Sequence, residues 1–146
     1  MILEMRHIGI VVDDLEKNLV FWRDVMGLSV TIDFWEEGNF IDTVQNLDGV
    51  KLHMIKLAAP DGSSIELLKD DSHPTPPPER NRICDRGIRH IAFTVADVQE
   101  SWSTLRHHGC EVLSNPVNSP DGKARLFFAR DPEGNLLEIV EVLSGP

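Results

Sequence analysis

The sequence lacks the features that mark membrane-spanning, secreted and nucleic-acid-binding proteins. It has no run of about eighteen apolar residues, so we expect no membrane span. Its start, MILEMRHIGI, has no basic region followed by a long apolar stretch and a cleavage site, so we expect no signal peptide. Basic residues are few, 14 against 24 acidic ones, and the net charge is -10. Such a chain lacks the basic surface with which proteins bind nucleic acid.

Cysteine is scarce as well. Cys84 and Cys110 have neither zinc-finger nor redox-motif spacing, and they fit a reducing compartment, so we expect a cytoplasmic protein. With 146 residues, 41% of them hydrophobic, the chain has the composition of a soluble globular protein. This length suits one compact domain, or two small modules that share a core. A small-molecule partner is compatible with the net charge, because a small ligand responds mainly to local charge.

A proline-rich segment, DDSHPTPPPERNR (residues 70–82), interrupts the chain. Its four prolines and many charges suit neither a helix nor a strand. A plain surface loop would explain it, but the similar material on both sides favours a linker between modules. We therefore predict an N-terminal module at 1–72, a linker at 73–86 and a C-terminal module at 87–146, which together form one domain.

Each module is predicted to contain a strand, a helix and about three further strands. The first strands are RHIGIVV (6–12) and RHIAFTV (89–95). The helices follow at 13–27 and 97–109, each with an aspartate and a later glutamate as a capping box and a glycine at its end. The capping residues are Asp13 with Glu16 and Asp97 with Glu100. The strand-like runs that follow the helices are 28–35, 40–44, 50–57 and 63–69 in the first module. In the second module they are 110–114, 124–130 and 135–143.

The two modules have the pattern of one supersecondary unit used twice. Arg-His-Ile recurs with an offset of 83 residues, from His7 to His90. The pattern P-[DE]-G-x-x-[IL]-E recurs with an offset of 72, from Glu66 to Glu138. The difference between these offsets, 11 residues, is predicted to be loop inserted into the first module. Asp-Gly turns before apolar strands are common, but two matches in the same order make chance a poor explanation.

Each module places a histidine near the start of its first strand and a glutamate inside its last strand. Side chains alternate between the two faces of a strand, so His7 and His90 each share a face with a small residue two positions on. These small neighbours leave room for a ligand. Glu66 and Glu138 stand between aliphatic residues that face the opposite way, so we expect the carboxylates on the same kind of face as the histidines.

A glutamate buried in a central strand costs free energy unless it is paired or bound to a cation. Two histidines and two glutamates form a donor set that suits Ni, Co, Mn, Fe or Zn, and it lacks the thiolates of a closed structural zinc site. Taken singly, a strand histidine is more often structural and a strand glutamate is more often solvated. The repeated pattern favours a divalent-metal site made of His7, Glu66, His90 and Glu138.

The remaining histidines and aromatic residues are less informative. His53 is predicted to be a partly exposed neutral residue, with a place in the pocket wall as the alternative. His107 and His108 stand at a helix end, where an imidazolium interacts favourably with the helix dipole. One of Phe127 and Phe128 must face the ligand-binding side of the sheet, because neighbouring strand residues point in opposite directions. The aromatic residues expected in the core are Phe21, Trp22 and Trp102.

The chain resembles the vicinal oxygen chelate superfamily, which includes glyoxalase I, methylmalonyl-CoA epimerase, extradiol dioxygenases, and fosfomycin and bleomycin resistance proteins. The resemblance covers nearly the whole chain and rests on HIGIVVDDLEKNLVFWRDVMGL, GIRHIAFTVADV and FFARDPEGNLLEIVE, of which the last is the most specific. It implies an α+β fold in which two tandem βαβββ modules form a curved half-barrel mixed sheet around one metal ion. It also implies a homodimer in which His7, Glu66, His90 and Glu138 are the metal ligands.

Among the members, glyoxalase I of the bacterial type uses His, Glu, His and Glu, as here. Methylmalonyl-CoA epimerase is similar in layout but typically has Gln where this chain has Glu66. Extradiol dioxygenases and fosfomycin enzymes typically use two His and one Glu, and bleomycin-binding proteins lack the ligands. The stretch NFIDTVQNLDGVKLHMIKLAAP is longer than in typical glyoxalase I and has no clear equivalent of the basic residues that hold glutathione.

The function expected from these residues is proton transfer at carbon. Four protein ligands leave two adjacent positions of an octahedral ion for two substrate oxygens, and a carbonyl bound there is stabilised as an enolate. Glu138, or Glu66 from the opposite side, is the predicted base. The first hypothesis is therefore a metal-dependent isomerase or lyase, such as an epimerase or a lactoylglutathione lyase. The alternatives are an Fe(II)-dependent dioxygenase and a drug- or metabolite-binding protein without turnover.

Overall fold

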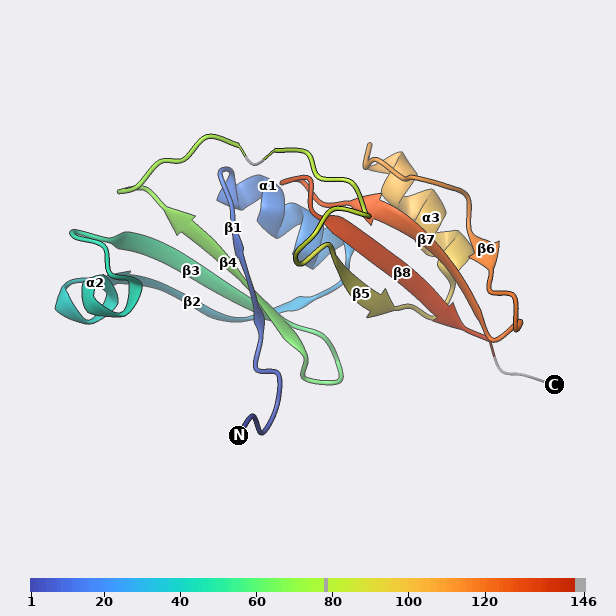
Figure 1. Ribbon diagram of the computed structural model, residues 1–146, viewed down its shortest axis with the longest axis horizontal. Coiled ribbons are helices and arrows are strands. Elements are labelled where there is room, and N and C mark those ends of the chain that lie inside the picture. Colours follow the sequence, from blue (N-terminus) through green and yellow to red (C-terminus); the bar gives the residue numbers. More distant parts are fainter. Residues whose placement is uncertain (78, 144–146) are drawn as a thin grey trace. The chain divides into compact units, whose positions relative to one another are not determined.

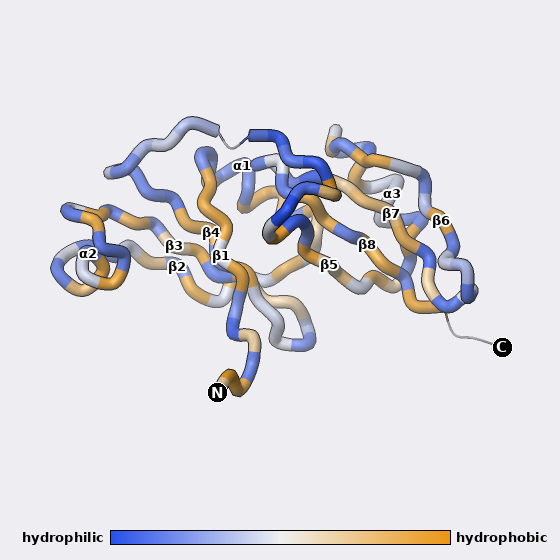
Figure 2. Tube along the Cα trace, in the orientation of Figure 1, coloured by the Kyte–Doolittle hydropathy of each residue, from blue (hydrophilic) through white to orange (hydrophobic). Residues whose placement is uncertain are grey.

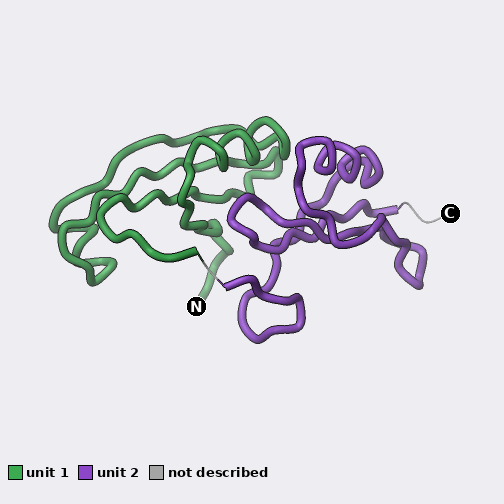
Figure 3. The backbone as a smooth tube through the Cα atoms, turned by 90° about the horizontal axis from the view of Figure 1, so that it is seen from above, with its two compact units in different colours: residues 1–77 green, residues 78–146 purple. Residues whose placement is uncertain are grey.

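The chain folds as two compact units. The computed structural model describes residues 1–77 and 79–143, and the boundary between the units falls at 77/78, inside the proline-rich segment (Figure 3). Each unit is built around its own four-stranded sheet. The predicted modules, 1–72 and 87–146, each fall within one unit. The role of residues 73–86 as a linker stays a prediction.

Unit 1 (residues 1–77) contains four strands and the helices between them (Figure 1). Its sheet has the order β1-β4-β3-β2, in which β1 runs parallel to β4 and the other pairs are antiparallel. The first and last strands therefore lie side by side, although most of the unit separates them in sequence. The elements are β1 (Ile8–Val11), α1 (Leu15–Leu19), the π-helical turn η1 (Val20–Val25), β2 (Ser29–Glu37), α2 (Asn39–Gln45), β3 (Lys51–Ala58) and β4 (Ser64–Asp70).

Unit 2, which includes the described residues 79–143, repeats this plan. Its sheet has the order β5-β8-β7-β6, again with the first strand parallel to the last and the other pairs antiparallel. The elements are β5 (His90–Thr94), α3 (Val98–His107), β6 (Val117–Asn118), β7 (Ala124–Arg130) and β8 (Leu136–Val142).

The predicted α+β class is confirmed, as is the order of a strand, a helix and three strands in each unit. Each sheet is mixed, with one parallel and two antiparallel strand pairs. The half-barrel around a metal ion stays a prediction, because the strand pairs define two separate four-stranded sheets, one in each unit. None of the helices in the described residues is long and apolar enough to cross a membrane.

The two main helices begin at aspartates that are 83 residues apart (97 − 14). Asp14 accepts a hydrogen bond from the Lys17 backbone N–H at 2.9 Å. Asp97 accepts two, from the second and third residues after it, each at 2.8 Å. The predicted cap at Asp97 is confirmed. The predicted cap at Asp13 is wrong by one residue, because the Asp14 carboxylate is the one that reaches a free N–H of the first turn.

The helical segment of unit 1 is one residue longer than that of unit 2. The terminal glycine lies 13 positions after the cap aspartate (27 − 14), against 12 positions in unit 2 (109 − 97). The extra residue is accommodated in η1, where the Met26 N–H donates to the Phe21 carbonyl, five residues back, at 2.9 Å. The closing glycines, with φ of 76° and 73°, take the left-handed conformation expected where a helix ends.

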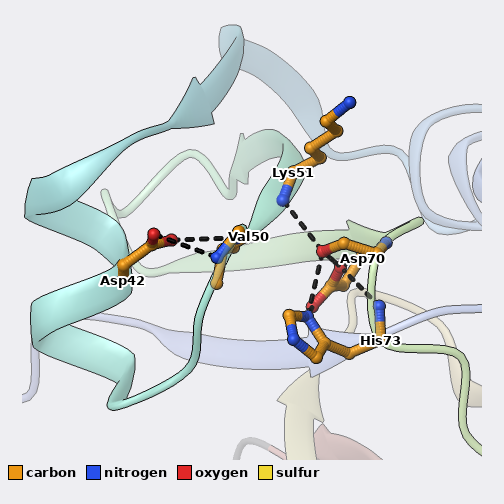
Figure 4. Close-up of polar contacts among 7 residues, drawn as sticks. Asp42, Val50, Lys51, Asp70 and His73 are labelled. Atoms are coloured by element: carbon orange, nitrogen blue, oxygen red, sulfur yellow. Dashed lines mark hydrogen bonds and ion pairs between the residues drawn. The ribbon is translucent and has the colours of Figure 1, made fainter.

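Residues 40–44, predicted as a strand, instead lie in the helix α2. Gly38 and Asn46, the residues that flank it, both have positive φ, and the left-handed Asn46 caps the C-terminal end of the helix. The Asp42 carboxylate accepts hydrogen bonds from the Val50 N–H at 2.8 Å and from the preceding N–H at 3.0 Å (Figure 4). These bonds fasten α2 to the start of β3. The excess residues of the first module are therefore partly helical, and the prediction of a plain inserted loop is wrong.

Residues 110–114, also predicted as a strand, form only one bridge, between Val112 and Ala129. The Leu113 N–H donates to a β7 carbonyl at 2.8 Å, so the segment follows β7 without forming a regular ladder. Pro116 follows, and it has no N–H to donate. The outer strand of this sheet is β6, only two residues long, which the sequence does not predict.

The main core of each unit packs on the face of its sheet opposite the strand glutamate, and unit 1 has a smaller buried cluster of Ile41, Val50 and Leu52 on the other face. The aliphatic neighbours of the two strand glutamates, including Leu67 and Ile139, are fully buried. Figure 2 shows that hydrophilic residues interrupt these apolar strands. Phe21 and Trp22 are buried as predicted. Trp102 is only half-buried and donates its indole N–H to a backbone carbonyl at 3.1 Å, so the prediction of a core residue there is wrong.

Candidate metal centre

In unit 1, a histidine and a glutamate meet on one face of the sheet. His7 lies directly before β1, and Glu66 lies in the neighbouring strand β4. Gly9 faces Glu66 in the parallel register, and His7 lies two residues before Gly9. Because strand side chains alternate between faces, His7 points to the same face as Glu66. Nε2 of His7 lies 3.1 Å from Oε2 of Glu66. Glu66 is buried, with 8% of its surface exposed.

The same arrangement occurs in unit 2. Ala92 faces Glu138 in the parallel register of β5 and β8, and His90 again stands two residues before that position. Nε2 of His90 lies 3.1 Å from Oε2 of Glu138. This pair is more open, with side-chain exposures of 40% and 22% against 30% and 11% in unit 1. Each unit thus brings its own predicted histidine and glutamate together.

The donor atoms of each pair fit neighbouring positions on a divalent ion. With bonds of about 2.1 Å, adjacent donors of an octahedral complex lie about 3 Å apart, close to both observed N–O distances. The same separation suits a hydrogen bond from an imidazole N–H to a carboxylate. Each pair supplies only two ligands. No group of three or more His, Cys, Asp or Glu side chains that could hold a metal occurs among residues 1–77 and 79–143.

The two histidines differ in burial. Nδ1 of His7 is buried and has no hydrogen-bond partner among the described residues, whereas His90 is an exposed residue. A hydrogen bond to Glu66 puts the His7 proton on Nε2, whereas an ion on Nε2 would put it on Nδ1. The orientation of His7 is therefore set by packing and by Glu66.

Lys56 is a third residue at the first pair, and sequence reasoning misses it. It faces Glu66 in the antiparallel register of β3 and β4, so both side chains leave the same face. Its Nζ lies 3.0 Å from Oε1 of Glu66, and the two side chains are 16% and 11% exposed. The sequence does contain a signal for this contact, the Asp61-Gly62 turn. A hairpin centred on that turn places residue 56 opposite residue 66, just as it places residue 58 opposite residue 64.

Phe128 occupies the equivalent position in unit 2, 72 residues after Lys56 (128 − 56). It faces Glu138 in the register of β7 and β8, and its ring meets that of His90 edge to face at 5.5 Å. Phe127 points the other way and is buried. The prediction that one of the two phenylalanines faces the ligand side therefore applies to Phe128.

His53 lies away from the first pair. It is three residues from Lys56 along β3, so its side chain leaves the opposite face of the sheet. There it stacks on Trp35, with ring centroids 4.5 Å apart, and its Nε2 lies 2.7 Å from a carboxylate oxygen of Asp33. The His53 side chain is 20% exposed. The predicted partial exposure of His53 is confirmed, and the alternative of a pocket wall beside the first pair is wrong.

Three further histidines take no part in either pair. His107 and His108 end α3, as predicted. His73 follows β4, and its Nδ1 lies 3.1 Å from a carboxylate oxygen of Asp70 (Figure 4). Partial burial raises the pKa of Asp70, but hydrogen bonds from Ser72 and His73 outweigh it and hold that pKa below its usual value. Asp70 thus organises the chain where it leaves β4.

The turns that precede the two glutamates have the same backbone hydrogen bonds. The Ala59 N–H donates to the Ser63 carbonyl at 2.9 Å, and the Asp131 N–H donates to the Asn135 carbonyl at 3.0 Å. In each turn the glycine N–H donates back to the first residue at 3.0 Å. The equivalent residues are 72 apart (131 − 59 and 135 − 63), the offset that also separates the glutamates. The repeat in the sequence is therefore a repeat of structure.

Asp131 adds side-chain bonds that Ala59 cannot make. Its carboxylate accepts hydrogen bonds from the Glu133 N–H at 3.0 Å, the Asn135 N–H at 2.7 Å and the Asn135 side-chain amide at 2.9 Å. Only 5% of its surface is exposed. Burial raises the pKa of Asp131 above its usual 3.8, even though these bonds act in the opposite direction. This aspartate fastens the turn that leads into β8.

Comparisons with known proteins agree with this architecture. The uncharacterized protein YaeR of Escherichia coli is 29% identical, over 94% of this chain and 95% of its own. The lactoylglutathione lyase of Schizosaccharomyces pombe is 28% identical, over 94% of this chain and 47% of that protein. The crystal structure of a glyoxalase family protein from Bacillus cereus superposes with a TM-score of 0.89 at 29% identity, covering 99% of this chain and 97% of that one.

A sequence profile extends the match over nearly the whole chain, from residue 4 to residue 139. The matched region includes both histidines, both glutamates and both turns that precede the glutamates. The chain belongs to the Glyoxalase/Bleomycin resistance protein/Dioxygenase superfamily.

Proposed function

We propose that the protein is a divalent-metal-dependent enzyme that moves a proton at a carbon next to a carbonyl group. Its substrate is a small molecule with two neighbouring oxygen atoms. One observation supports this above all: both units present a histidine and a glutamate, 3.1 Å apart, at the same register of equivalent strands. Similarity to a lactoylglutathione lyase supports a lyase or an isomerase.

We assign one ion to the two pairs together, with His7, Glu66, His90 and Glu138 as ligands. These residues come from one chain or from two copies of it. Two imidazole nitrogens and two carboxylates suit Ni, Co, Zn, Mn or Fe. A bound ion supplies Lewis-acid stabilisation of the negative oxygen that forms when the carbon loses its proton.

Glu138 is better placed than Glu66 to act as the base. Both oxygens of Glu66 are engaged, Oε2 with His7 and Oε1 with Lys56. Among the described residues, Glu138 has one ionic partner, His90, at Oε2. Oε1 of Glu138 is therefore the atom that accepts the proton from carbon and returns it. An epimerase needs a second acceptor on the other face of the carbon, and Glu66 would take that role.

Deuterium exchange tests this reaction directly. The protein is stripped with a chelator, reloaded with one metal at a time, and incubated in heavy water with 2-oxo acids, ketoaldehyde–thiol adducts or acyl-CoAs. Mass spectrometry then measures deuterium at carbon. We expect exchange with one of these classes, and only after metal is restored.

Other outcomes would contradict the proposal. Exchange that is equally fast in the stripped protein would remove the need for an ion. Oxygen uptake with Fe(II) would indicate a dioxygenase, and tight binding without exchange or turnover would indicate a binding protein.

We also propose that the enzyme is a cytoplasmic homodimer. Cys84 and Cys110 are not joined by a disulfide, and Cys84 is exposed, which suits a reducing compartment. The dimer follows from the resemblance to the superfamily. Light scattering during size-exclusion chromatography should give the mass of two chains, and a mass of one chain would contradict it.

A further inference from the structure

The charge of Lys56 is not explained by a site that only binds a metal ion. Its ammonium lies 3.0 Å from an oxygen of Glu66, where it opposes the approach of a second cation to the same carboxylate. Unit 2 shows that the fold does not need a cation at this position, because the equivalent residue there is Phe128. The lysine therefore serves something other than the ion.

Lys56 is also isolated among the basic residues of its sheet. The strands of unit 1, all of which lie in the described range 1–77, contain two more lysines, Lys51 and Lys69. The register places both on the opposite face. The Lys56 side chain is only 16% exposed, so its ammonium is not an ordinary solvated surface charge.

Beside Lys56 the same face of the sheet becomes apolar. In the next row of the register, Val11 faces Leu68, Leu68 faces Met54, and Met54 faces Phe34. Val11 is 64% exposed and Phe34 is 37% exposed, so the two ends of this row are open to a ligand, whereas Leu68 between them packs against the buried cluster of Ile41, Val50 and Leu52. One ammonium next to a partly open apolar row suits a molecule that has an anionic group and an apolar part.

We propose that Lys56 binds the carboxylate of a small organic acid, the substrate of the proposed enzyme, whose apolar part lies on the neighbouring row. The inference rests on the proposed function, because an ion held by Glu66 would neutralise that carboxylate and leave the Lys56 ammonium to the substrate. The residues of the apolar row are Val11, Leu68, Met54 and Phe34.

A carboxylate fits this face better than a phosphate does. The face carries two more acidic residues, because Glu36 and Asp70 both face Leu52, which is on the same side of β3 as Lys56. Their charges repel an anion, and the repulsion is greater for a doubly charged phosphate than for a singly charged carboxylate. A single ammonium matches a single negative charge.

Calorimetric titration of an acid and its neutral ester tests the inference. The probes are 4-methyl-2-oxopentanoate and its methyl ester, added to the zinc-loaded protein. We expect Lys56→Met to weaken binding of the acid about tenfold or more, as the loss of a charge-assisted hydrogen bond does, and to change ester binding little. Lys56→Arg should retain most of the acid binding. Lys51→Met, on the same strand but on the opposite face, is the matched control and should behave as the wild type.

Two results would overturn the role of Lys56. One is acid binding that Lys56→Met leaves unchanged. The other is an equal loss of acid and ester, which would mean that the substitution damages the fold. Far-ultraviolet circular dichroism of each variant identifies misfolded protein, and Lys56→Arg supplies the comparison if Lys56→Met does not fold.

Zinc titration without the acid separates this inference from the proposed function. Lys56→Met should bind zinc at least as tightly as the wild type, because a cation beside Glu66 has been removed. If the wild type binds no ion, the proposed function fails. The metal-free Glu66→Gln variant then tests Lys56 alone, because the substitution removes the carboxylate that pairs with the ammonium. Acid binding that is present in Glu66→Gln and absent in Glu66→Gln/Lys56→Met would support the role of Lys56, and acid binding that persists in the double variant would overturn that role.

Discussion

In unit 1 the Glu66 carboxylate is held by His7 and Lys56, whereas in unit 2 the Glu138 carboxylate contacts His90 beside an aromatic ring. The strand order, the register and the preceding turn are the same in the two units. The backbone therefore places the two glutamates alike, and the residue opposite each one makes them different. A repeated module can keep a pair of ligands and still assign different roles to its two copies.

The units also differ in what supports the pair. Unit 1 has the longer edge strand β2 and the added helix α2, where unit 2 has a two-residue β6. Unit 2 instead fastens its last turn through the buried Asp131, at a position where unit 1 has Ala59.

Replacement of each carboxylate by an amide should show the largest difference between the units. Glu138→Gln removes the proposed base and should slow deuterium exchange by about 100- to 10,000-fold at saturating metal. Glu66→Gln should mainly weaken metal binding, with a smaller loss of exchange rate once metal is saturating. The exposed Glu100→Gln is the control. Equal losses of exchange rate in the two variants would show that the two glutamates do not have different roles. Full turnover by metal-loaded Glu138→Gln would exclude Glu138 as the base.

The turns offer the next comparison. Asp131→Ala removes three hydrogen bonds from a buried site and should lower the free energy of unfolding by about 1–3 kcal/mol. Asp61→Ala, in the exposed turn of unit 1, should have a much smaller effect, because water replaces the bonds that it loses. Urea unfolding followed by circular dichroism measures both. Equal losses would show that Asp131 does not fasten its turn.

The same two aspartates should respond to pH in opposite directions. Burial raises the pKa of Asp131, so its contribution to stability is complete below pH 3.8 and is lost as pH rises through the higher folded value. The Ser63 side chain lowers the pKa of Asp61, so its contribution is present above pH 3.8 and is lost as pH falls through the lower value.

Asparagine variants measure these contributions. Relative to the wild type, Asp131→Asn should gain stability as pH rises from 3.8. Asp61→Asn should lose stability, relative to the wild type, as pH rises towards 3.8. Urea unfolding between pH 3 and 7 gives both slopes, and slopes of the same sign would refute the assignment.

The helix caps should give the smallest difference. Removal of an aspartate cap costs about 0.5–2 kcal/mol. Asp97 accepts two backbone hydrogen bonds and Asp14 accepts one, so Asp97→Ala should cost more than Asp14→Ala. Thermal unfolding of the two variants measures the difference, and the reverse order would show that the number of bonds does not set the cost.

The sequence predicts the two pairs because the histidine motif and the glutamate motif each occur twice, at fixed offsets. Each glutamate also follows the same kind of turn. His7 and Glu66 alone would have read as an ordinary strand histidine and a solvated glutamate. Lys56 escapes notice because a lysine in an alternating strand normally faces water, and only the register shows that it faces Glu66. The register follows from the Asp61-Gly62 turn, so this contact can be predicted.

The sequence misleads where local preference and context disagree. Residues 40–44 are rich in strand-forming types, but they form a helix that the left-handed Asn46 caps and that Asp42 ties to the start of β3. Residues 110–114 have an apolar pattern that suits a strand, and Pro116 limits their pairing.

Metal content of the purified protein tests the central claim, that the two pairs are halves of one site, most directly. The wild type should hold one ion per chain. His7→Ala/Glu66→Ala and His90→Ala/Glu138→Ala should each lose it, because two ligands are too few to retain it. Two ions per chain in the wild type, or one ion kept by either double variant, would contradict the account.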